Sequence, residues 1–155
     1  MFDVPAVENP IITRLNGHWK FPEKMDPFAN TGFVYVIRDN VLERFYLGKK
    51  FFKTTRQNRP VESDWKRYKG SSRTMDLLFD NRPIDEFEFI VLEQYKFRGA
   101  VSYAETWTLC LVEAPTTNVW YNTRIEEVTW TVKEKVSVRH KERLEKVIRI
   151  EAFNK

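Results

Sequence analysis

Residues 32–56 read GFVYVIRDNVLERFYLGKKFFKTTR and contain two short apolar, aromatic runs, Gly32 to Ile37 and Arg44 to Gly48. Both runs have the β-branched and aromatic content that is typical of strands. The turn-forming cluster Arg38-Asp39-Asn40 lies between them. The stretch therefore predicts a β-hairpin, around which we expect the rest of the chain to fold.

The predicted hairpin brings two tyrosines together. Because side chains alternate along a strand, Phe33, Tyr35 and Ile37 share one face, and the second strand brings Tyr46 alongside. Four cationic residues follow at once, namely Lys49, Lys50, Lys53 and Arg56. We therefore expect both phenols to open onto positive charge.

Positive charge is concentrated beside this hairpin. The chain of 155 residues has a formal net charge of +4, yet residues 38–73 alone hold eleven Lys and Arg against four Asp and Glu. Such a local excess suits a site that holds phosphates. A solvated, lysine-rich loop would give the same count, so charge alone leaves both interpretations open.

Aromatic residues are interspersed with the cations after the hairpin. Trp65 and Tyr68 lie among lysines and arginines, a mixture in which rings can stack on bases while cations meet phosphates. The predicted DNA-binding residues are Lys49, Lys50, Lys53, Arg59, Trp65, Lys66, Arg67, Tyr68 and Lys69.

Two further elements are predicted from local patterns. Ser71 or Ser72 can cap a short helix over residues 73–80. Alternating apolar residues then predict a third strand over residues 87–95. The expected fold class is α/β (α+β), a small three-stranded antiparallel β-sheet flanked by helices.

The principal helix is expected over residues 103–114, opened by Ser102 and stopped by Pro115. The residues predicted to face the sheet are Tyr103, Trp107, Cys110, Leu111 and Ala114. Glu105 falls in the first turn, where Ser102 to Glu105 fits a capping box and the glutamate would only satisfy a backbone N–H. Metal binding is the functional alternative for this carboxylate.

Segments before and after the core are expected to extend it. Residues 1–31 contain four prolines with apolar residues between them, which predicts an extended arm packed on the domain. Residues 126–155 are predicted to form a strand at 128–132 and a helix at 139–153. Covering the sheet is the favoured role of this tail, and DNA binding or the pairing of two subunits are the alternatives. The core itself is placed at residues 32–125.

The hairpin resembles the two halves of the GIY-YIG nuclease motif. Gly32-Phe33-Val34-Tyr35 is similar to the first half, with the tyrosine one place later than in the bare Gly-x-Tyr form, and Tyr46-Leu47-Gly48 is similar to the second. Arg56, Glu105 and Asn122 follow in the order in which the family has its catalytic arginine, metal-binding glutamate and terminal asparagine. Five landmarks in order make the resemblance much stronger than any one triplet.

The resemblance implies a DNA endonuclease that hydrolyses phosphodiester bonds with a divalent metal, Mg²⁺ or Mn²⁺, held by Glu105. It implies that Tyr46 acts as the base and Tyr35 as a positioning residue. A phenol has an ordinary pKa of about 10, so Tyr46 would need neighbouring cations to act near neutral pH. Lys49, Lys50 and Arg56 are the expected source of that field.

The resemblance also implies that Arg56 binds the scissile phosphate and that Asn122 orients a nearby group or the phosphate. Arg67 is the competing arginine, because it too lies in the basic segment, and a turn residue is the alternative for Asn122.

One departure concerns histidine, which the family often has a few residues after its arginine. Here the histidines are His18 and His140, neither in that place. Lysines or Tyr68 could take the place of this histidine, or the base role rests wholly on Tyr46.

The segment Glu62 to Ser72 is similar to short, phage-borne GIY-YIG proteins of the Seg-like homing endonuclease type. The expected role is a phage-encoded homing or host-DNA-degrading nuclease. A restriction-type nuclease, a branched-DNA-resolving nuclease and a non-catalytic nucleic-acid-binding module are the alternatives. A monomer would nick, whereas a homodimer would cut both strands.

Cysteine usage and the lack of long apolar runs indicate where in the cell the protein is expected. Cys110 is the single cysteine, which excludes an internal disulfide, and no membrane-spanning run or signal peptide pattern is present. We therefore expect a cytoplasmic protein without a membrane partner, located in the host cell's cytoplasm if a phage encodes it.

Overall fold

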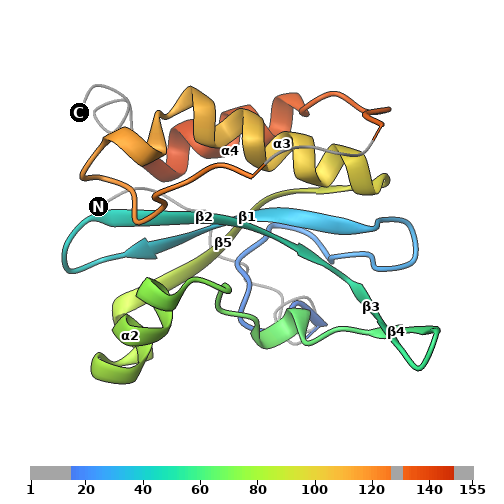
Figure 1. Cartoon of the computed structure of the whole chain (residues 1–155), viewed down its shortest axis with the longest axis horizontal. Coiled ribbons are helices and arrows are strands. Elements are labelled where there is room, and N and C mark those ends of the chain that lie inside the picture. Colours follow the sequence, from blue (N-terminus) through green and yellow to red (C-terminus); the bar gives the residue numbers. More distant parts are fainter. Residues whose placement is uncertain (1–14, 127–130, 149–155) are drawn as a thin grey trace.

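A three-stranded antiparallel sheet forms the centre of the computed structural model, which describes residues 15–126 and 131–148. The strand order is β2-β1-β5, with β1 (Gly32–Asp39) between β2 (Arg44–Phe51) and β5 (Phe87–Tyr95). The predicted hairpin and third strand are confirmed, and so is the fold class (Figure 1).

The central strand separates two hydrophobic cores, because every residue of β1 is buried. Val34 and Val36 belong to one core, whereas Phe33, Tyr35 and Ile37 belong to the other. The predicted sharing of one face by these last three residues is thus confirmed. Figure 1 shows helices on one side of the sheet, with coil, α2 and a small ribbon on the other side.

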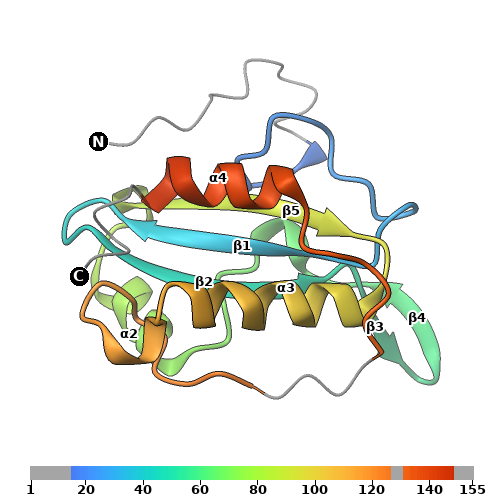
Figure 2. The same ribbon diagram turned by 90° about the horizontal axis from the view of Figure 1, so that it is seen from above.

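Two helices cover the first face of the sheet. Figure 2 shows α3 (Arg98–Leu111) and α4 (Val138–Ile148) side by side above it, with α4 over β5 and α3 over β2. No helix among the described residues is long and apolar enough to cross a bilayer. The strand predicted at 128–132 falls largely outside the described residues, and residues 131 and 132 have no strand structure.

Helix α3 starts earlier than predicted, and different residues from those predicted face the sheet. It begins at Arg98, with Phe97 in the N-cap position, so Ser102 is a buried interior residue and not a cap. Tyr103, Cys110 and Leu111 are exposed, although they were predicted to face the sheet. Small residues pack on the sheet instead and allow close approach, and the buried ones include Gly99, Ala100, Val101, Ala104 and Thr108.

The second face is covered by segments with little regular structure. Trp19 and Phe21 are buried in the second core, together with Trp65 from the short helix η1 (Trp65–Arg67). Lys20 lies along β5, where its N–H donates to Phe89 O over 2.7 Å. Below this layer, α2 (Arg73–Asn81) begins after Ser72, whose side chain accepts a hydrogen bond from Met75 N, as predicted.

A β-ribbon leaves the sheet where β2 ends. Its strands β3 (Lys53–Arg56) and β4 (Arg59–Glu62) pair only with each other, through a turn in which Gln57 and Asn58 have positive φ. Nearly all of its residues are exposed. Sequence patterns did not predict this element. The remaining short helices are η2 (Ile84–Glu86) and η3 (Ala114–Thr116).

A buried carboxylate ties three parts of the fold together. Asp39, at the end of β1, accepts two hydrogen bonds from the Arg82 guanidinium, at 2.6 and 2.7 Å, and one from the Tyr121 hydroxyl at 2.6 Å. It also accepts from the N–H groups of Val41 and Leu42 in the hairpin turn. These bonds hold the pKa of Asp39 well below its usual range, although burial alone would raise it.

A buried histidine joins α4 to α3 and β5. Thr108 Oγ1 donates its hydrogen to Ala104 O, so it must accept from His140 Nε2–H at 2.9 Å. His140 Nδ1 is then the acceptor for the Tyr95 hydroxyl, also at 2.9 Å. The imidazole is thus held neutral, and burial lowers its pKa to about 3 from 6.5.

This histidine predicts a pH-dependent stability. The unfolded chain takes up a proton near pH 6.5 while folded His140 does not, so stability present above pH 6.5 is lost as the pH falls toward 3. The free energy of unfolding should fall by about 1.4 kcal/mol per pH unit from this group. Urea unfolding at pH 7, 6, 5 and 4 should show a shallower decline for His140→Gln than for the wild type. Equal slopes between pH 6 and 5 would contradict the assignment.

Candidate active site

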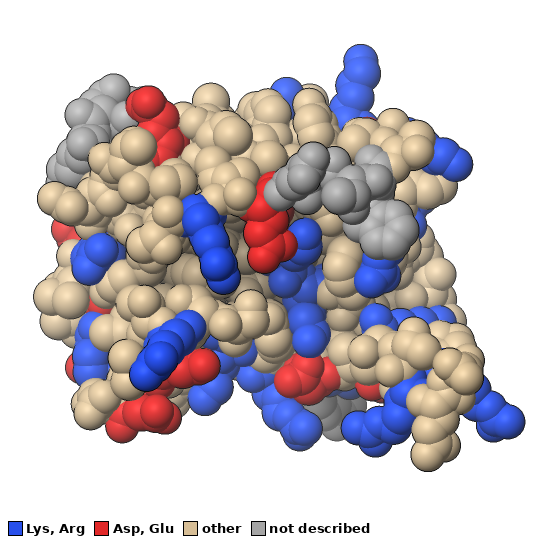
Figure 3. Space-filling view, in the orientation of Figure 1, with Lys and Arg blue, Asp and Glu red and all other residues tan. Residues whose placement is uncertain are grey.

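A broad polar pocket of about 910 Å³ lies on the β2 side of the molecule, between α3, the loop after the ribbon, and residues 121–126. Figure 3 shows lysine and arginine side chains over the centre of this face and along its lower right, with acidic side chains between them. The described cations in the lining are Lys49, Lys50, Lys53, Arg73, Arg98 and Arg124, and the carboxylates are Glu105 and Glu126.

The two predicted tyrosines meet at this pocket. The ring centroids of Tyr35 and Tyr46 are 6.4 Å apart, and Tyr68 packs edge-on against Tyr35 at 6.2 Å. Tyr35 is buried, whereas Tyr46 is partly buried and its hydroxyl interacts with Ser71. The hairpin therefore places both phenols as its sequence alternation predicts.

Both phenols hold their protons more tightly than an exposed tyrosine. Burial raises the pKa of Tyr35 well above 10. Burial, then the neighbouring Tyr68 and Glu105, raise the pKa of Tyr46 to about 12, while the hydrogen bond with Ser71 acts in the opposite direction. The expected lowering of these pKa values by nearby cations is therefore not found, because burial dominates both shifts.

Two glycines make room for the phenols. Gly48 pairs with Tyr35 across the hairpin, and a Cβ atom at Gly48 would lie 2.3 Å from the Tyr35 hydroxyl oxygen. Gly70 has a φ of +90°, and a Cβ there would lie 3.1 Å from Cε1 of Tyr46. The glycine of the Tyr-Leu-Gly triplet is thus required by the buried ring opposite it.

Glu105 faces the pocket from the interior of α3. The helix begins at Arg98, so the capping-box explanation for this glutamate is wrong. Its side chain is 12% exposed, and its Oε1 lies 3.6 Å from Lys49 Nζ, which also donates to Ser102 Oγ at 3.2 Å. Burial raises the pKa of Glu105, Lys49 lowers it, and Glu126 raises it. Glu105 is therefore a poorly solvated carboxylate with a cationic neighbour.

Asn122 holds the segment 119–122, whose last two residues line the pocket, against β2. Its Oδ1 accepts from Leu47 N over 2.9 Å and its Nδ2 donates to Leu47 O over 2.7 Å, so the side-chain amide pairs with β2 as a backbone would. Nearby, Tyr121 N–H donates to Phe45 O, and Phe45 N–H donates to Val119 O. Residues 119–122 are thereby held along β2, beside Tyr46.

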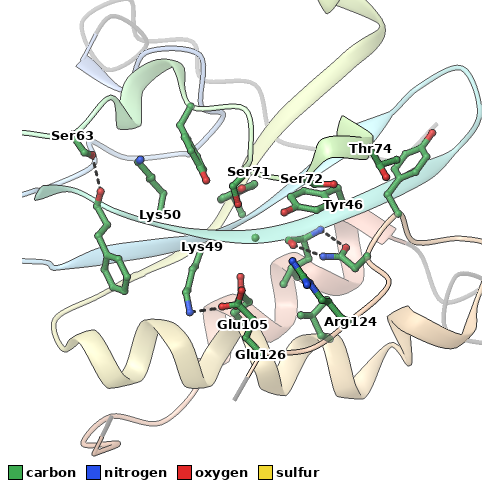
Figure 4. A pocket seen from close by; sticks show the side chains of 18 of the residues that line it. Tyr46, Lys49, Lys50, Ser63, Ser71, Ser72, Thr74, Glu105, Arg124 and Glu126 are labelled. Atoms are coloured by element: carbon green, nitrogen blue, oxygen red, sulfur yellow. Dashed lines mark hydrogen bonds and ion pairs between the residues drawn. The ribbon is translucent and has the colours of Figure 1, made fainter. Parts of the chain in front are cut away.

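The loop after the ribbon forms the opposite wall. Lys50 Nζ lies 2.8 Å from Asp64 Oδ1 and 3.9 Å from the centre of the Tyr68 ring. This ammonium lowers the pKa of Asp64. Lys50 is thus held at the pocket between a carboxylate and an aromatic ring. Figure 4 shows the Lys50 side chain among those that line the pocket.

Several residues predicted for the site do not line the pocket: Arg56, Arg59, Trp65, Lys66, Arg67 and Lys69. Arg56 and Arg59 pair across the tip of the exposed ribbon. Trp65 is 2% exposed, and its ring N–H donates to Glu62. Their roles in catalysis or in binding DNA remain predictions.

The pocket also contains residues that sequence reasoning missed. Arg124 and Glu126 follow Asn122 at alternate positions, and all three line it. The polar residues at every second position from 122 to 126 could have indicated that these side chains point to one side. The pattern is short, however, and lies in a segment without regular structure. Arg73, Arg98 and Ser71 were missed as well, because they come from separate parts of the chain that meet only in the fold.

The close approach of Gly48 to the Tyr35 ring predicts that a methyl group added at position 48 destabilises the fold. Gly48→Ala should lower the free energy of unfolding by about 1–3 kcal/mol, because the buried ring must shift. Adding Tyr35→Phe, which removes the nearest atom, should recover part of that loss, since the ring carbon Cζ would still lie 2.5 Å away. Urea unfolding of the two single variants and the double variant measures this coupling, and strictly additive losses would contradict it.

Comparison with protein families gives one match. The family model described as "Putative endonuclease segE, GIY-YIG domain" matches residues 18–125. No curated protein and no solved structure matches the chain. The matched range includes both halves of the tyrosine hairpin, α3 and Asn122, and covers more than half of the sequence. The chain therefore belongs to the segE-type GIY-YIG endonuclease family.

Proposed function

We propose that this chain is a metal-dependent DNA endonuclease that hydrolyses phosphodiester bonds in the pocket beside β2. The observation that carries the proposal is the meeting of Glu105 with Tyr46 in one cation-lined cavity. Phosphodiester hydrolysis needs an activated water, a stabilised negative charge on the phosphate and a protonated leaving group. The pocket holds groups suited to each of these needs.

The donor set fits a small divalent cation. Among the described residues, no group of three or more His, Cys, Asp or Glu could bind a metal. The pocket lining supplies two carboxylates, those of Glu105 and Glu126. Mg²⁺ commonly uses one or two carboxylates and keeps several waters, and Mn²⁺ accepts the same oxygen ligands. Glu105, with Glu126 beside it, would hold the metal, which when bound supplies Lewis acidity toward the phosphate.

Tyr46 is the proposed proton acceptor, acting at its Oη atom. With a pKa of about 12 it keeps its proton in the metal-free protein, and the negative charge of Glu105 is one cause. The hydrogen bond with Ser71 lowers this pKa and so favours the phenolate, and a metal held by Glu105 would offset the charge of that carboxylate. Tyr35 stays protonated and acts as a positioning residue, since its ring packs against Tyr46.

The proposed substrate is DNA, bound through the cations of the pocket and of the loop that follows the ribbon. A phage-encoded homing or host-DNA-degrading nuclease in the host's cytoplasm is the setting we favour, because the family match is to a segE-type domain. A restriction-type nuclease or a resolvase of branched DNA would use the same pocket. One site per chain gives nicking by a monomer, and a homodimer would present two sites.

Cleavage of supercoiled plasmid tests the proposed function. With Mg²⁺ or Mn²⁺ the wild type should give nicked or linear DNA, and EDTA should abolish the reaction. Glu105→Ala and Tyr46→Phe should each reduce the rate by about 100-fold or more, because each removes a group that acts on the reacting atoms. Gel-shift binding of the same DNA without metal should stay within about threefold, since catalysis and binding are separable.

Matched controls are available on the solvent-exposed surface. Glu145→Ala removes an exposed glutamate from α4, and Tyr103→Phe removes a hydroxyl from α3 outside the pocket lining. Both should cleave at the wild-type rate. DNA binding by the wild type without any metal-dependent cleavage would instead identify a non-catalytic nucleic-acid-binding module.

The pKa of Glu105 predicts a pH dependence of metal binding. Metal binds the carboxylate form, and burial raises the pKa of Glu105 above 4.5, so Mn²⁺ affinity should begin to fall at a higher pH than for an ordinary glutamate. Lys49→Ala removes a charge that lowers this pKa, and should move the fall to still higher pH. Mn²⁺ titrations of DNA-free protein by electron paramagnetic resonance between pH 5 and 8 measure both. An unchanged profile in Lys49→Ala would count against this pairing.

A further inference from the structure

The place of Arg56 leaves the pocket without its expected arginine. Arg56 ends β3 and pairs with Arg59 at the tip of an exposed ribbon whose strands pair only with each other. It does not line the pocket that holds Tyr46 and Glu105. Another group must therefore bind the phosphate there if the pocket hydrolyses DNA.

Half of the cations that line the pocket already have partners. Lys49 lies 3.6 Å from Glu105, and Lys50 lies 2.8 Å from Asp64. The guanidinium carbon of Arg98 lies 4.0 Å from the centre of the Phe51 ring. Among the described side chains, the pocket cations without a recorded ion pair or ring contact are Lys53, Arg73 and Arg124.

Arg124 differs from the other two in its position and chemistry. It lies between Asn122, which is fixed to Leu47, and Glu126, whose carbonyl oxygen accepts from Thr106 Oγ1 at 3.3 Å. Its segment is thus anchored on both sides, to β2 and to α3. Figure 4 shows Arg124 projecting toward the same part of the pocket as Tyr46 and Glu105.

A guanidinium at this place suits a phosphate better than an ammonium. Its planar fork can donate two parallel hydrogen bonds to phosphate oxygens, which fixes their orientation as well as neutralising charge. Lys53 has no such fork and belongs to the ribbon. Arg73 has the fork but begins α2, on the wall opposite the segment that carries Arg124.

We propose that Arg124 is the catalytic arginine of this chain, binding the scissile phosphate in the role that the family resemblance implies for Arg56. The inference rests on the proposed nuclease function. Asn122 is then a positioning residue, because its paired bonds to Leu47 set the place of Arg124 relative to Tyr46. Arg56 serves outside the pocket, on the exposed ribbon.

The test compares three arginines under single-turnover conditions. A fluorescein-labelled DNA duplex is cleaved with Mg²⁺ and saturating protein, and binding is measured by fluorescence anisotropy in EDTA. Arg124→Ala should reduce the cleavage rate by about 100- to 1,000-fold while the Kd changes by less than about threefold. Arg124→Lys, which keeps the charge but not the fork, should recover only part of the rate. Arg56→Ala and Arg73→Ala should stay within about tenfold of the wild-type rate at saturation.

Lys24→Ala is the charge-matched control, since Lys24 is exposed and outside the pocket lining. Arg124 is itself exposed, so the unfolding temperature of its variants should match that of the wild type. Wild-type cleavage together with equal cleavage by Arg124→Ala would overturn this assignment while leaving the nuclease function in place. A larger loss from Arg56→Ala or Arg73→Ala would also overturn it. Failure of the wild type to cut would instead remove the proposed function and this inference with it.

Discussion

β1 has no exposed residue, and a strand that is buried on both faces needs a separate core on each side. The helices α3 and α4 supply one cover, and the amino-terminal segment with Trp19 and Trp65 supplies the other. The pocket opens where this second cover ends beside β2. Tyr35 therefore belongs to the core and to the pocket wall at once, which gives the site a rigid base.

The parts of the fold that depend on residues close together in the sequence could be predicted from it. The hairpin, the third strand and the Ser72 cap depend on neighbouring residues, and the structure has all three. The start of α3 could not be predicted in this way. Large apolar residues such as Tyr103 suggested the inward face, whereas close packing on the sheet selects small ones such as Ala100 and Ala104.

The candidate site was predictable where its residues lie on the hairpin, and less so elsewhere. Tyr35 and Tyr46 come together because strand pairing converts sequence alternation into proximity. Arg56 does not line the pocket with Tyr46, because the chain leaves the sheet after β2 and forms a separate ribbon. The number of residues between Tyr46 and Arg56 therefore does not indicate how far apart their side chains lie. Arg124 lies far from the hairpin in sequence, and its segment returns to β2 through the bonds of Asn122 to Leu47 and of Tyr121 to Phe45.

The segments that run along the two outer strands have a further consequence for self-association. Lys20 bridges to Ile90 on the outer side of β5, and Trp120 bridges to Phe45 on the outer side of β2. A bare strand edge presents unpaired N–H and C=O groups that can recruit a strand from another molecule and start aggregation. These two bridges occupy part of each edge. The segment that carries Lys20 thus protects solubility as well as covering the core, and a fragment cut back to the hairpin alone would expose a template for intermolecular β-pairing.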